Sequence, residues 1–193
     1  MNILWLGPKR QQMHEFMISQ GENVLYYDGL LKVDSLSLAN TDFIVSYGYR
    51  YILNKEITTT FHHKAINLHI SYLPWNRGAD PNFWSILEDT PKGVTIHYID
   101  ENLDTGDIIV QKEVEIDLDG TLRSSYEQLS EALENLFYSN WDGIKNNIIE
   151  TKNNSSEYGS FHYKKDKSTF DYLLHRGWDT PIIDIIGEYN KRF

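Results

Sequence analysis

The sequence contains no cysteine, which excludes disulfides, thiolate metal sites and cysteine nucleophiles. It also lacks long apolar runs: residues 1–7 are too short for a signal peptide, and no later run could span a bilayer. Basic residues are few, with 18 Lys and Arg against 28 Asp and Glu, which gives a formal net charge of −10. Because so acidic a surface repels phosphate backbones, we expect no nucleic-acid partner. From the lack of a signal peptide and of a membrane-spanning run we expect a soluble, cytoplasmic protein with no membrane partner.

The sequence does contain enough apolar material for one hydrophobic core. Its 193 residues match the size of a single domain, and 40% of them are hydrophobic and 13% aromatic. No repeat, low-complexity segment or linker interrupts the chain. We therefore predict a single domain over residues 1–193, with a C-terminal helical tail over about 160–193.

The order of apolar patterns in the first half predicts an α/β fold. Short apolar runs, typical of buried strands, occur at residues 3–6, 23–27 and 43–47. Met13, Phe16 and Met17 recur at helical spacing between the first two runs. Strand, helix and strand in this order indicate a mostly parallel central sheet flanked by helices.

The second half adds a strand pair and three helices. Residues 93–99 and 107–116 predict an antiparallel pair, and apolar residues three or four apart predict the longest helix from Thr121 to Ile144. The apolar stripe of that helix could serve the core or a second copy of the chain, so we also consider a homodimer. Asp80-Pro81 and Thr180-Pro181 predict two further helix starts, the first of them capped by Asp80.

The strand-like segment at residues 65–70 carries the first candidate site. Residues two apart on a strand point the same way, so Asn67 and His69 present a carboxamide and an imidazole to one small volume. Leu73-Pro74 then turns the chain out of the sheet. An amide donor beside a titratable ring can hold a developing oxyanion. The alternative is that both side chains are satisfied polar groups at the end of a strand.

An acidic turn at residues 100–107 supplies the second candidate, with four carboxylates in eight residues. A calcium loop would need Gly at its sixth position and Glu at its twelfth, where this sequence has Thr105 and Gln111. We therefore reject a calcium site and interpret the segment as a turn between two strands. One of its carboxylates could face His69, or all of them could be solvated hairpin residues.

Three motifs span these two segments and the strand between them: Asn67-x-His69-x-Ser71-x-Leu73-Pro74-x-x-Arg77-Gly78, Gly93-Val94-Thr95-Ile96-His97 and Leu103-Asp104-Thr105-Gly106. In this combination the sequence resembles the folate-dependent formyltransferases, most closely between Gly48 and Gln111. That family includes glycinamide ribonucleotide, methionyl-tRNA and nucleotide-sugar N-formyltransferases.

The resemblance implies a Rossmann-like formyltransferase fold whose site lies at the carboxyl ends of the strands. It also implies N10-formyltetrahydrofolate as co-substrate, and a catalytic trio of Asn67, His69 and Asp104. By the same resemblance, the folate pocket would use Tyr51, Ile52 and Leu53 after Gly48, and Tyr98, Ile99, Asp100 and Asn102 before the catalytic Asp. The loop with Trp75, Arg77 and Gly78 would border the amine substrate.

The chemistry suits these residues. An amine that attacks the formyl carbon gives a tetrahedral intermediate with an oxyanion and an ammonium. Asn67 and a protonated His69 would stabilise the oxyanion, and preorganised donors of this type contribute about 3–4 kcal/mol each. Asp104 would orient His69 or pair with its charge, raise its pKa, and could relay the amine proton.

Arg77 and three histidines can each be interpreted as functional or as structural residues. Arg77 could bind an anionic group of the substrate, or it could clamp the acidic turn at residues 100–107. His62, His63 and His97 lack a metal-ligand spacing such as HExxH, so we interpret them as structural and expect no metal.

Further features separate the acceptors within the family. Pro8 stands in the loop where glycinamide ribonucleotide enzymes carry a glycine-rich phosphate loop. Methionyl-tRNA enzymes have an extra C-terminal domain and a basic surface, whereas this chain ends at residue 193 with a net charge of −10. The third group, the nucleotide-sugar N-formyltransferases, formylates an amino group on a nucleotide-linked deoxysugar for surface glycans. Residues 80–84 and 162–166 resemble the corresponding segments of this group. Lys164, Lys165 and Lys167 would then hold a diphosphate or form a solvated face.

Two alternatives come from other functional classes. A hydrolase would send the formyl group to water and would need no amine. A non-catalytic Rossmann nucleotide-binding module is disfavoured, because no GxGxxG motif follows the first strand and the trio would then have no purpose. The sequence therefore predicts a folate-dependent N-formyltransferase that acts on a small nucleotide-sugar substrate.

Overall fold

Strands and helices alternate through the first part of the computed structural model, which describes residues 1–154 and 157–191. In chain order these elements are β1 (Asn2–Leu6), α1 (Gln11–Ser19), β2 (Asn23–Tyr27), the 3₁₀ turn η1 (Leu36–Leu38), β3 (Phe43–Ser46), α2 (Lys55–Thr60) and β4 (Ala65–His69). The predicted strands and the first predicted helix are therefore present. Gly21, just beyond α1, adopts the positive φ of 76° that favours glycine where a helix ends.

The second part of the chain adds two more strands of the main sheet and most of the helices. Its elements are β5 (Arg77–Gly78), α3 (Pro81–Leu87), β6 (Gly93–Tyr98), β7 (Ile108–Glu113), α4 (Leu122–Lys145), β8 (Phe161–His162), the 3₁₀ turns η2 (Asp166–Leu173) and η3 (Gly177–Asp179), and α5 (Ile182–Asn190). We call residues 157–191 the tail.

The central sheet has six strands in the order β2-β1-β3-β4-β6-β7. β1 pairs in parallel with β2 and β3, and β3 pairs in parallel with β4. β6 and β7 run antiparallel, as the sequence pattern predicted for this pair. The mostly parallel α/β sheet is thus confirmed, and a small separate sheet joins β5 to β8.

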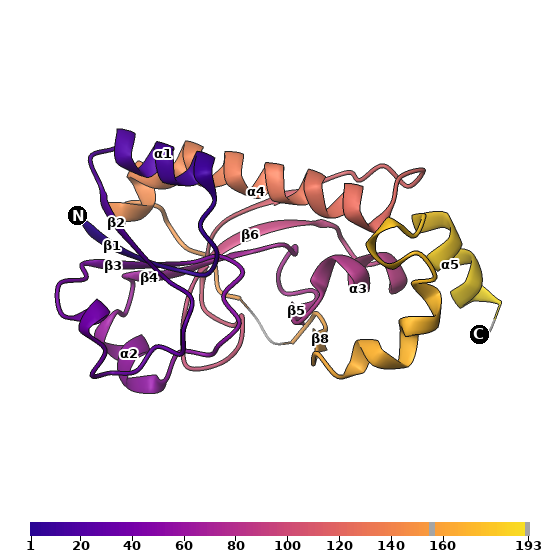
Figure 1. The fold of residues 1–193 in the computed structure, drawn as a ribbon, viewed down its shortest axis with the longest axis horizontal. Coiled ribbons are helices and arrows are strands. Elements are labelled where there is room, and N and C mark those ends of the chain that lie inside the picture. Colours follow the sequence, from indigo (N-terminus) through magenta and orange to yellow (C-terminus); the bar gives the residue numbers. More distant parts are fainter. Residues whose placement is uncertain (155–156, 192–193) are drawn as a thin grey trace.

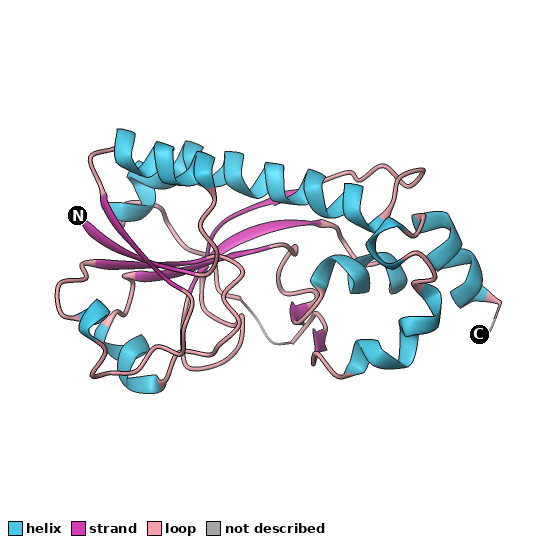
Figure 2. Cartoon of the chain, in the orientation of Figure 1, coloured by secondary structure: helices cyan, strands magenta, loops and turns pink. Residues whose placement is uncertain are grey.

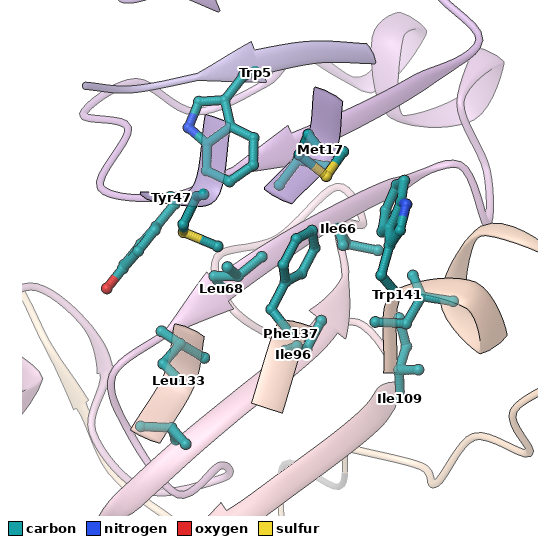
Figure 3. Close-up of a cluster of buried hydrophobic side chains, with 14 of the residues drawn as sticks. Trp5, Met17, Tyr47, Ile66, Leu68, Ile96, Ile109, Leu133, Phe137 and Trp141 are labelled. Carbon is teal, nitrogen blue, oxygen red and sulfur yellow. The ribbon is translucent and has the colours of Figure 1, made fainter. Parts of the chain in front are cut away.

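Helices cover both faces of the central sheet (Figures 1 and 2), with α1 and α4 on one face and α2 on the other. Because side chains alternate along a strand, Ile3 and Trp5 of β1 pack in the core under α1 and α4, whereas Leu4 and Leu6 pack with α2. Figure 3 shows Trp5 and Met17 near Phe137 and Trp141 of α4 in the larger core.

The long helix α4 follows its sequence signals closely. Thr121 caps it: its hydroxyl accepts from the backbone NH of Ser124, and the Ser124 hydroxyl accepts in turn from the NH of Thr121. Leu129, Leu133 and Phe137 of the predicted stripe are almost completely buried against the sheet. The stripe therefore serves the core of this chain, and the homodimer stays a prediction.

Helix α3 begins at Pro81 as predicted, but Asp80 does not cap it. Asp80 adopts a left-handed backbone, with φ at 55°, and its side chain makes no capping hydrogen bond. Its carboxylate instead pairs with Lys167 of the tail at 2.7 Å. A long-range ion pair has replaced the local interaction that the sequence suggested.

The tail packs at the end of the molecule that carries α3 (Figure 1). β8 pairs with β5, the ring of His162 stacks on Trp84 at 3.9 Å, and Ile182 and Ile185 of α5 join the cluster under α3. The tail is therefore tied to the loop that leads from β4 to α3.

Candidate active site

The candidate site begins at the carboxyl end of β4. Leu68 points into the core under α4, so its neighbours Asn67 and His69 point to the other face of the sheet. Both line a cavity of about 260 Å³ together with Ser46 at the end of β3. Open α/β sheets bind ligands at this edge.

Asp104 completes the predicted trio from the turn between β6 and β7. Its Oδ1 accepts a hydrogen bond from Asn67 Nδ2 at 3.1 Å, and its Oδ2 accepts from the backbone NH of Gly78 at 2.9 Å. His69 Nδ1 lies 3.8 Å from the same Oδ2. The structure therefore brings the three residues together around one carboxylate.

His97, which its spacing in the sequence marks only as a structural residue, is a fourth member of this group. It lies opposite Asn67 in the antiparallel pairing of β4 with β6, so both side chains share one face. Its Nε2 is 3.3 Å from Asn67 Nδ2 and 3.6 Å from Asp104 Oδ1. The alternation of Thr95 and His97 on a strand beside β4 was the signal that could have identified it.

The two imidazoles are held in fixed orientations by main-chain carbonyl groups. His97 Nδ1 lies 2.7 Å from the carbonyl oxygen of Tyr98, and His69 Nε2 lies 3.3 Å from that of Asn76. Since a carbonyl only accepts, we assign the hydrogen of each ring to these nitrogens. The unprotonated nitrogens, Nε2 of His97 and Nδ1 of His69, then face the Asp104 carboxylate.

Burial decides the charge of His69. Desolvation lowers its pKa below the ordinary 6.5, and the attraction of Asp104 only partly offsets this. We expected a protonated His69 from the nearby carboxylate, and that expectation is wrong for the free protein. Burial also raises the pKa of Asp104, but the attraction of His69 and His97 in their protonated forms and the NH of Gly78 outweigh it, so that the net pKa lies well below its usual range.

Arg77 and Asn154 hold the turn that carries Asp104. Arg77 Nε and Asn154 Nδ2 both donate to the main-chain carbonyl of Asp104, at 3.1 and 2.9 Å. Arg77 Nη2 also donates to the side-chain oxygen of Asn154 at 3.0 Å, and both residues are buried. Of the two roles considered for Arg77, the geometry supports the clamp on the acidic turn.

Most of the predicted folate residues line the same cavity. These are Tyr51, Ile52, Leu53, Ile99, Asp100 and Asn102. Tyr98 is turned away, because its position on β6 places its ring in the opposite core, where its hydroxyl donates to Asn147 Oδ1 at 2.6 Å. Its side chain therefore does not reach the cavity.

Of the three residues predicted to border the amine substrate, only one lies in the wall of the cavity. Gly78 lines the cavity and donates to Asp104, as described above. Trp75 and Arg77 are not in its wall, and the carbonyl of Trp75 accepts from the Ser71 hydroxyl. The position of Trp75 does not support a role in binding the acceptor, and that role stays a prediction.

Another hollow is larger than the cavity that holds the trio. It has a volume of about 1090 Å³, lies at the amino ends of the strands near Met1, Phe43 and Lys64, and contains none of the trio. Within residues 1–154 and 157–191, no three His, Asp or Glu side chains are grouped as metal ligands would be. Nor does any helix in this part of the chain have the length and apolarity needed to cross a bilayer.

Sequence comparisons point to one family. The formyl transferase family model matches residues 31–140, more than half of the chain. The methionyl-tRNA formyltransferase of Thermodesulfovibrio yellowstonii is 36% identical over 126 residues, which are 65% of this chain and 41% of the relative. That of Prochlorococcus marinus subsp. pastoris is 32% identical over 167 residues, 83% of this chain and 50% of the relative. The chain thus spans about half the length of the curated relatives it matches.

Solved structures extend the likeness to the tail. The formyltransferase PseJ from Anoxybacillus kamchatkensis is 51% identical, with a TM-score of 0.94, and the match covers 98% of this chain and 100% of that one. That structure contains UDP-4,6-dideoxy-4-formamido-L-AltNAc and tetrahydrofolate. A 4-N formyltransferase from Francisella tularensis, 23% identical with a TM-score of 0.75 over 87% of this chain and 78% of that one, shares the fold.

Proposed function

The chain belongs to the formyl transferase family, and we propose that it is an N10-formyltetrahydrofolate-dependent N-formyltransferase of nucleotide-linked amino-deoxysugars. The observation that carries this proposal is the convergence of Asn67, His69 and Asp104 at one cavity. The likeness to PseJ over nearly the whole chain supports a UDP-linked 4-amino-4,6-dideoxy sugar as the acceptor. Such a product would serve the synthesis of surface glycans, and a cytoplasmic location is part of the proposal.

The residues that surround the cavity suit a folate donor. Leu53 and Ile99 give it apolar walls, and both pack with the core under α2. Asp100 closes a hydrogen-bonded turn, in which its carboxylate accepts from the Thr105 hydroxyl at 2.7 Å and from the NH of Asn102 at 3.0 Å. An apolar slot with a few fixed polar groups is the usual form of a small-molecule site. The bound donor would supply the formyl carbon.

We assign the proton transfer to His69. Because its ring is neutral, Nδ1 can accept a proton from the attacking amine as the new C–N bond forms. The resulting imidazolium lies beside the Asp104 carboxylate, which stabilises the positive charge. His69 then gives the proton to the folate nitrogen as the bond to the formyl carbon breaks. The amine proton thus ends on the folate.

We assign the oxyanion contact to Asn67. Its NH₂ group donates to Asp104 and faces Nε2 of His97, so both of its hydrogens are held at the cavity wall. On substrate binding, the bond toward His97 would turn to the developing oxyanion. Asp104 has a positioning role through its contacts with Asn67 and the imidazoles.

The other acceptors have weaker support. The curated relatives act, by name, on methionyl-tRNA, but a formal charge of −10 opposes the approach of a nucleic acid. Pro8 removes a backbone donor from the loop after β1, where a ribose phosphate would need NH groups. We therefore place the nucleotide sugar first and expect no nucleic-acid partner.

Tetrahydrofolate release measured over a panel of acceptors tests this proposal. The panel contains UDP- and dTDP-linked 4-amino and 3-amino sugars, with glycinamide ribonucleotide and methionyl-tRNA as controls. We expect turnover with a UDP-linked 4-amino-4,6-dideoxy sugar and almost none with formyl donor alone. Release of formate without an amine would favour the hydrolase, and turnover with a control alone would refute the sugar acceptor.

A further inference from the structure

A second, smaller cavity opens beside the catalytic one. It has a volume of about 190 Å³ and shares Ile70, Pro81 and Tyr126 with the wall of the catalytic cavity. The two cavities therefore adjoin at these three residues, and Ile70 directly follows His69 of the trio in the chain. The folate-side residues Tyr51 to Leu53 line the first cavity and are absent from the wall of the second. A group held in the second cavity therefore approaches the reacting carbon from another side than the donor.

The tail supplies part of the wall of this second cavity. Lys167 of η2 and Trp178 of η3 line it together with Asp80, Asn82 and Phe83. Both tail residues lie outside residues 31–140, the part of the chain that matches the family model. The trio lies inside that part. The wall of the second cavity thus combines the family core with a segment that the family model does not cover.

The chemistry of this wall is aromatic, with one ion pair. Trp178 is 42% exposed and meets Tyr126 edge to face, with ring centroids 5.3 Å apart. Lys167 Nζ lies 5.8 Å from the centres of the Trp178 and Phe83 rings and 2.7 Å from Asp80 Oδ1. Such a wall offers apolar ring surface, an ammonium donor and a carboxylate acceptor within one small space.

We propose that this second cavity binds the amine-bearing deoxysugar ring of the acceptor, with Trp178 as its apolar platform and Lys167 and Asp80 as its polar contacts. This inference rests on the proposed function. The amine nitrogen must bond to the formyl carbon, so the ring that carries it is the part of the acceptor closest to the trio. The second cavity adjoins the catalytic cavity that holds the trio.

Size and polarity both favour a sugar ring over the nucleotide. Sites for whole drug-sized ligands have volumes of about 300–1,000 Å³, so about 190 Å³ suits one substituted ring rather than a complete nucleotide sugar. A 4,6-dideoxy ring presents more C–H surface than an ordinary hexose, which suits an aromatic wall. The single ammonium is already paired with Asp80, which makes it a weak site for a diphosphate.

Of the three lysines at positions 164, 165 and 167, the proposal gives a role in sugar binding only to Lys167. Lys164 and Lys165 are exposed, whereas Lys167 is half-buried and lines the second cavity. Lys165 and Tyr163 of the same tail segment lie outside the cavity wall and form a cation–π pair at 5.4 Å. Tyr163 provides a matched control for Trp178, and the exposed Lys191, which pairs with Glu188 outside the cavity wall, provides one for Lys167.

The test compares binding of UDP with binding of a UDP-linked 4-amino-4,6-dideoxy sugar, by calorimetry on protein saturated with tetrahydrofolate. For Trp178→Ala we expect about tenfold weaker binding of the UDP-sugar, the usual scale for a truncated aromatic anchor, with the affinity for UDP unchanged. Lys167→Met should raise the KM for the UDP-sugar and leave the KM for the formyl donor unchanged. Tyr163→Ala and Lys191→Met should behave as wild type.

Other outcomes overturn the assignment. Equal weakening of UDP and UDP-sugar in Trp178→Ala would place the nucleotide in the second cavity, and a loss of tetrahydrofolate affinity would assign the cavity to the donor. Unchanged binding of both ligands would remove any role for it. Circular dichroism checks that each variant is folded. A wild-type protein inactive with every nucleotide sugar would refute the proposed function itself, which is a distinct result.

Discussion

The side-chain amide of Asn154 donates a 2.9 Å hydrogen bond to the main-chain carbonyl of Asp104, 50 positions earlier in the chain. The same nitrogen donates to the carbonyl of Gly106 at 3.1 Å. Asp104 has a left-handed backbone with φ at 54°, which non-glycine residues adopt at a cost. The bonds from Asn154 and Arg77 stabilise this conformation and so aim the Asp104 carboxylate at Asn67 and His69.

Replacement of Asn154 by alanine should therefore lower kcat more than it changes either KM. The variant removes the Asn154 donor from the buried carbonyl of Gly106 and one of the two side-chain donors to the carbonyl of Asp104, which should reduce the free energy of unfolding by about 1–3 kcal/mol. Steady-state kinetics and urea denaturation measure the two effects. The neighbouring, exposed Asn153→Ala is the control, and equal effects of both variants would contradict the positioning role.

Removal of the Asn67 amide tests the oxyanion contact. Asn67→Ala should reduce kcat by about 10²–10³, the range measured when one preorganised donor to an oxyanion is lost. Tetrahydrofolate should still bind, since the side chain acts on the transition state. Rapid-quench measurement of a single turnover isolates this step. Activity close to that of the wild type in a folded variant would refute the assignment.

The lowered pKa of His69 predicts the acid limb of the pH profile. The proposed mechanism needs the neutral ring, so kcat/KM should fall as the pH drops through a pKa below 6.5. The protonated His69 first expected, with its pKa raised by Asp104, would instead make kcat/KM fall as the pH rises above 6.5. A profile of kcat/KM from pH 4.5 to 8 distinguishes the two, with His69→Gln as the inactive reference.

The same shift gives a stability prediction of definite sign. Below pH 6.5 the unfolded chain protonates His69 while the folded chain resists it, so the free energy of unfolding should decrease as the pH falls from 7 to 5. The slope from this one group cannot exceed about 1.4 kcal/mol per pH unit. Urea denaturation of the wild type and of His69→Gln should show a smaller decrease in the variant.

Replacement of glycine by alanine should have opposite effects on stability at Gly78 and at Gly187. At Gly78 φ is +90°, and an added Cβ would lie 2.3 Å from the carbonyl oxygen of His162, so Gly78→Ala should destabilise the protein by about 1–3 kcal/mol. At Gly187, inside α5, an added Cβ meets none of the described atoms within 4 Å, and Gly187→Ala should stabilise it by about 0.5–1 kcal/mol. Thermal unfolding measures both changes.

Gly78→Ala should also reduce activity, because the backbone NH of Gly78 donates to Asp104 Oδ2. Gly187→Ala should leave kcat unchanged. If Gly78→Ala were as stable and as active as the wild type, the pairing of β5 with β8 would not matter for the site.

The sequence alone determined the features that depend on near neighbours. A helical stripe fixed α4 and its buried face, and the strand period placed Asn67 and His69 on one side of β4. The same period places Tyr98 on the face opposite His97, although we had predicted that Tyr98 lines the folate pocket. The membership of Asp104 in the trio came from the resemblance rather than from any local pattern.

Only the tertiary structure decided which groups meet across the chain and how deeply they are buried. It replaced the expected Asp80 cap with a pair to Lys167, and brought His97 and Asn154 to the Asp104 turn. It also made His69 neutral, because desolvation depends on everything that surrounds the ring. Helix and strand periods are properties of a few consecutive residues, whereas burial and charge pairing depend on segments that only folding brings together.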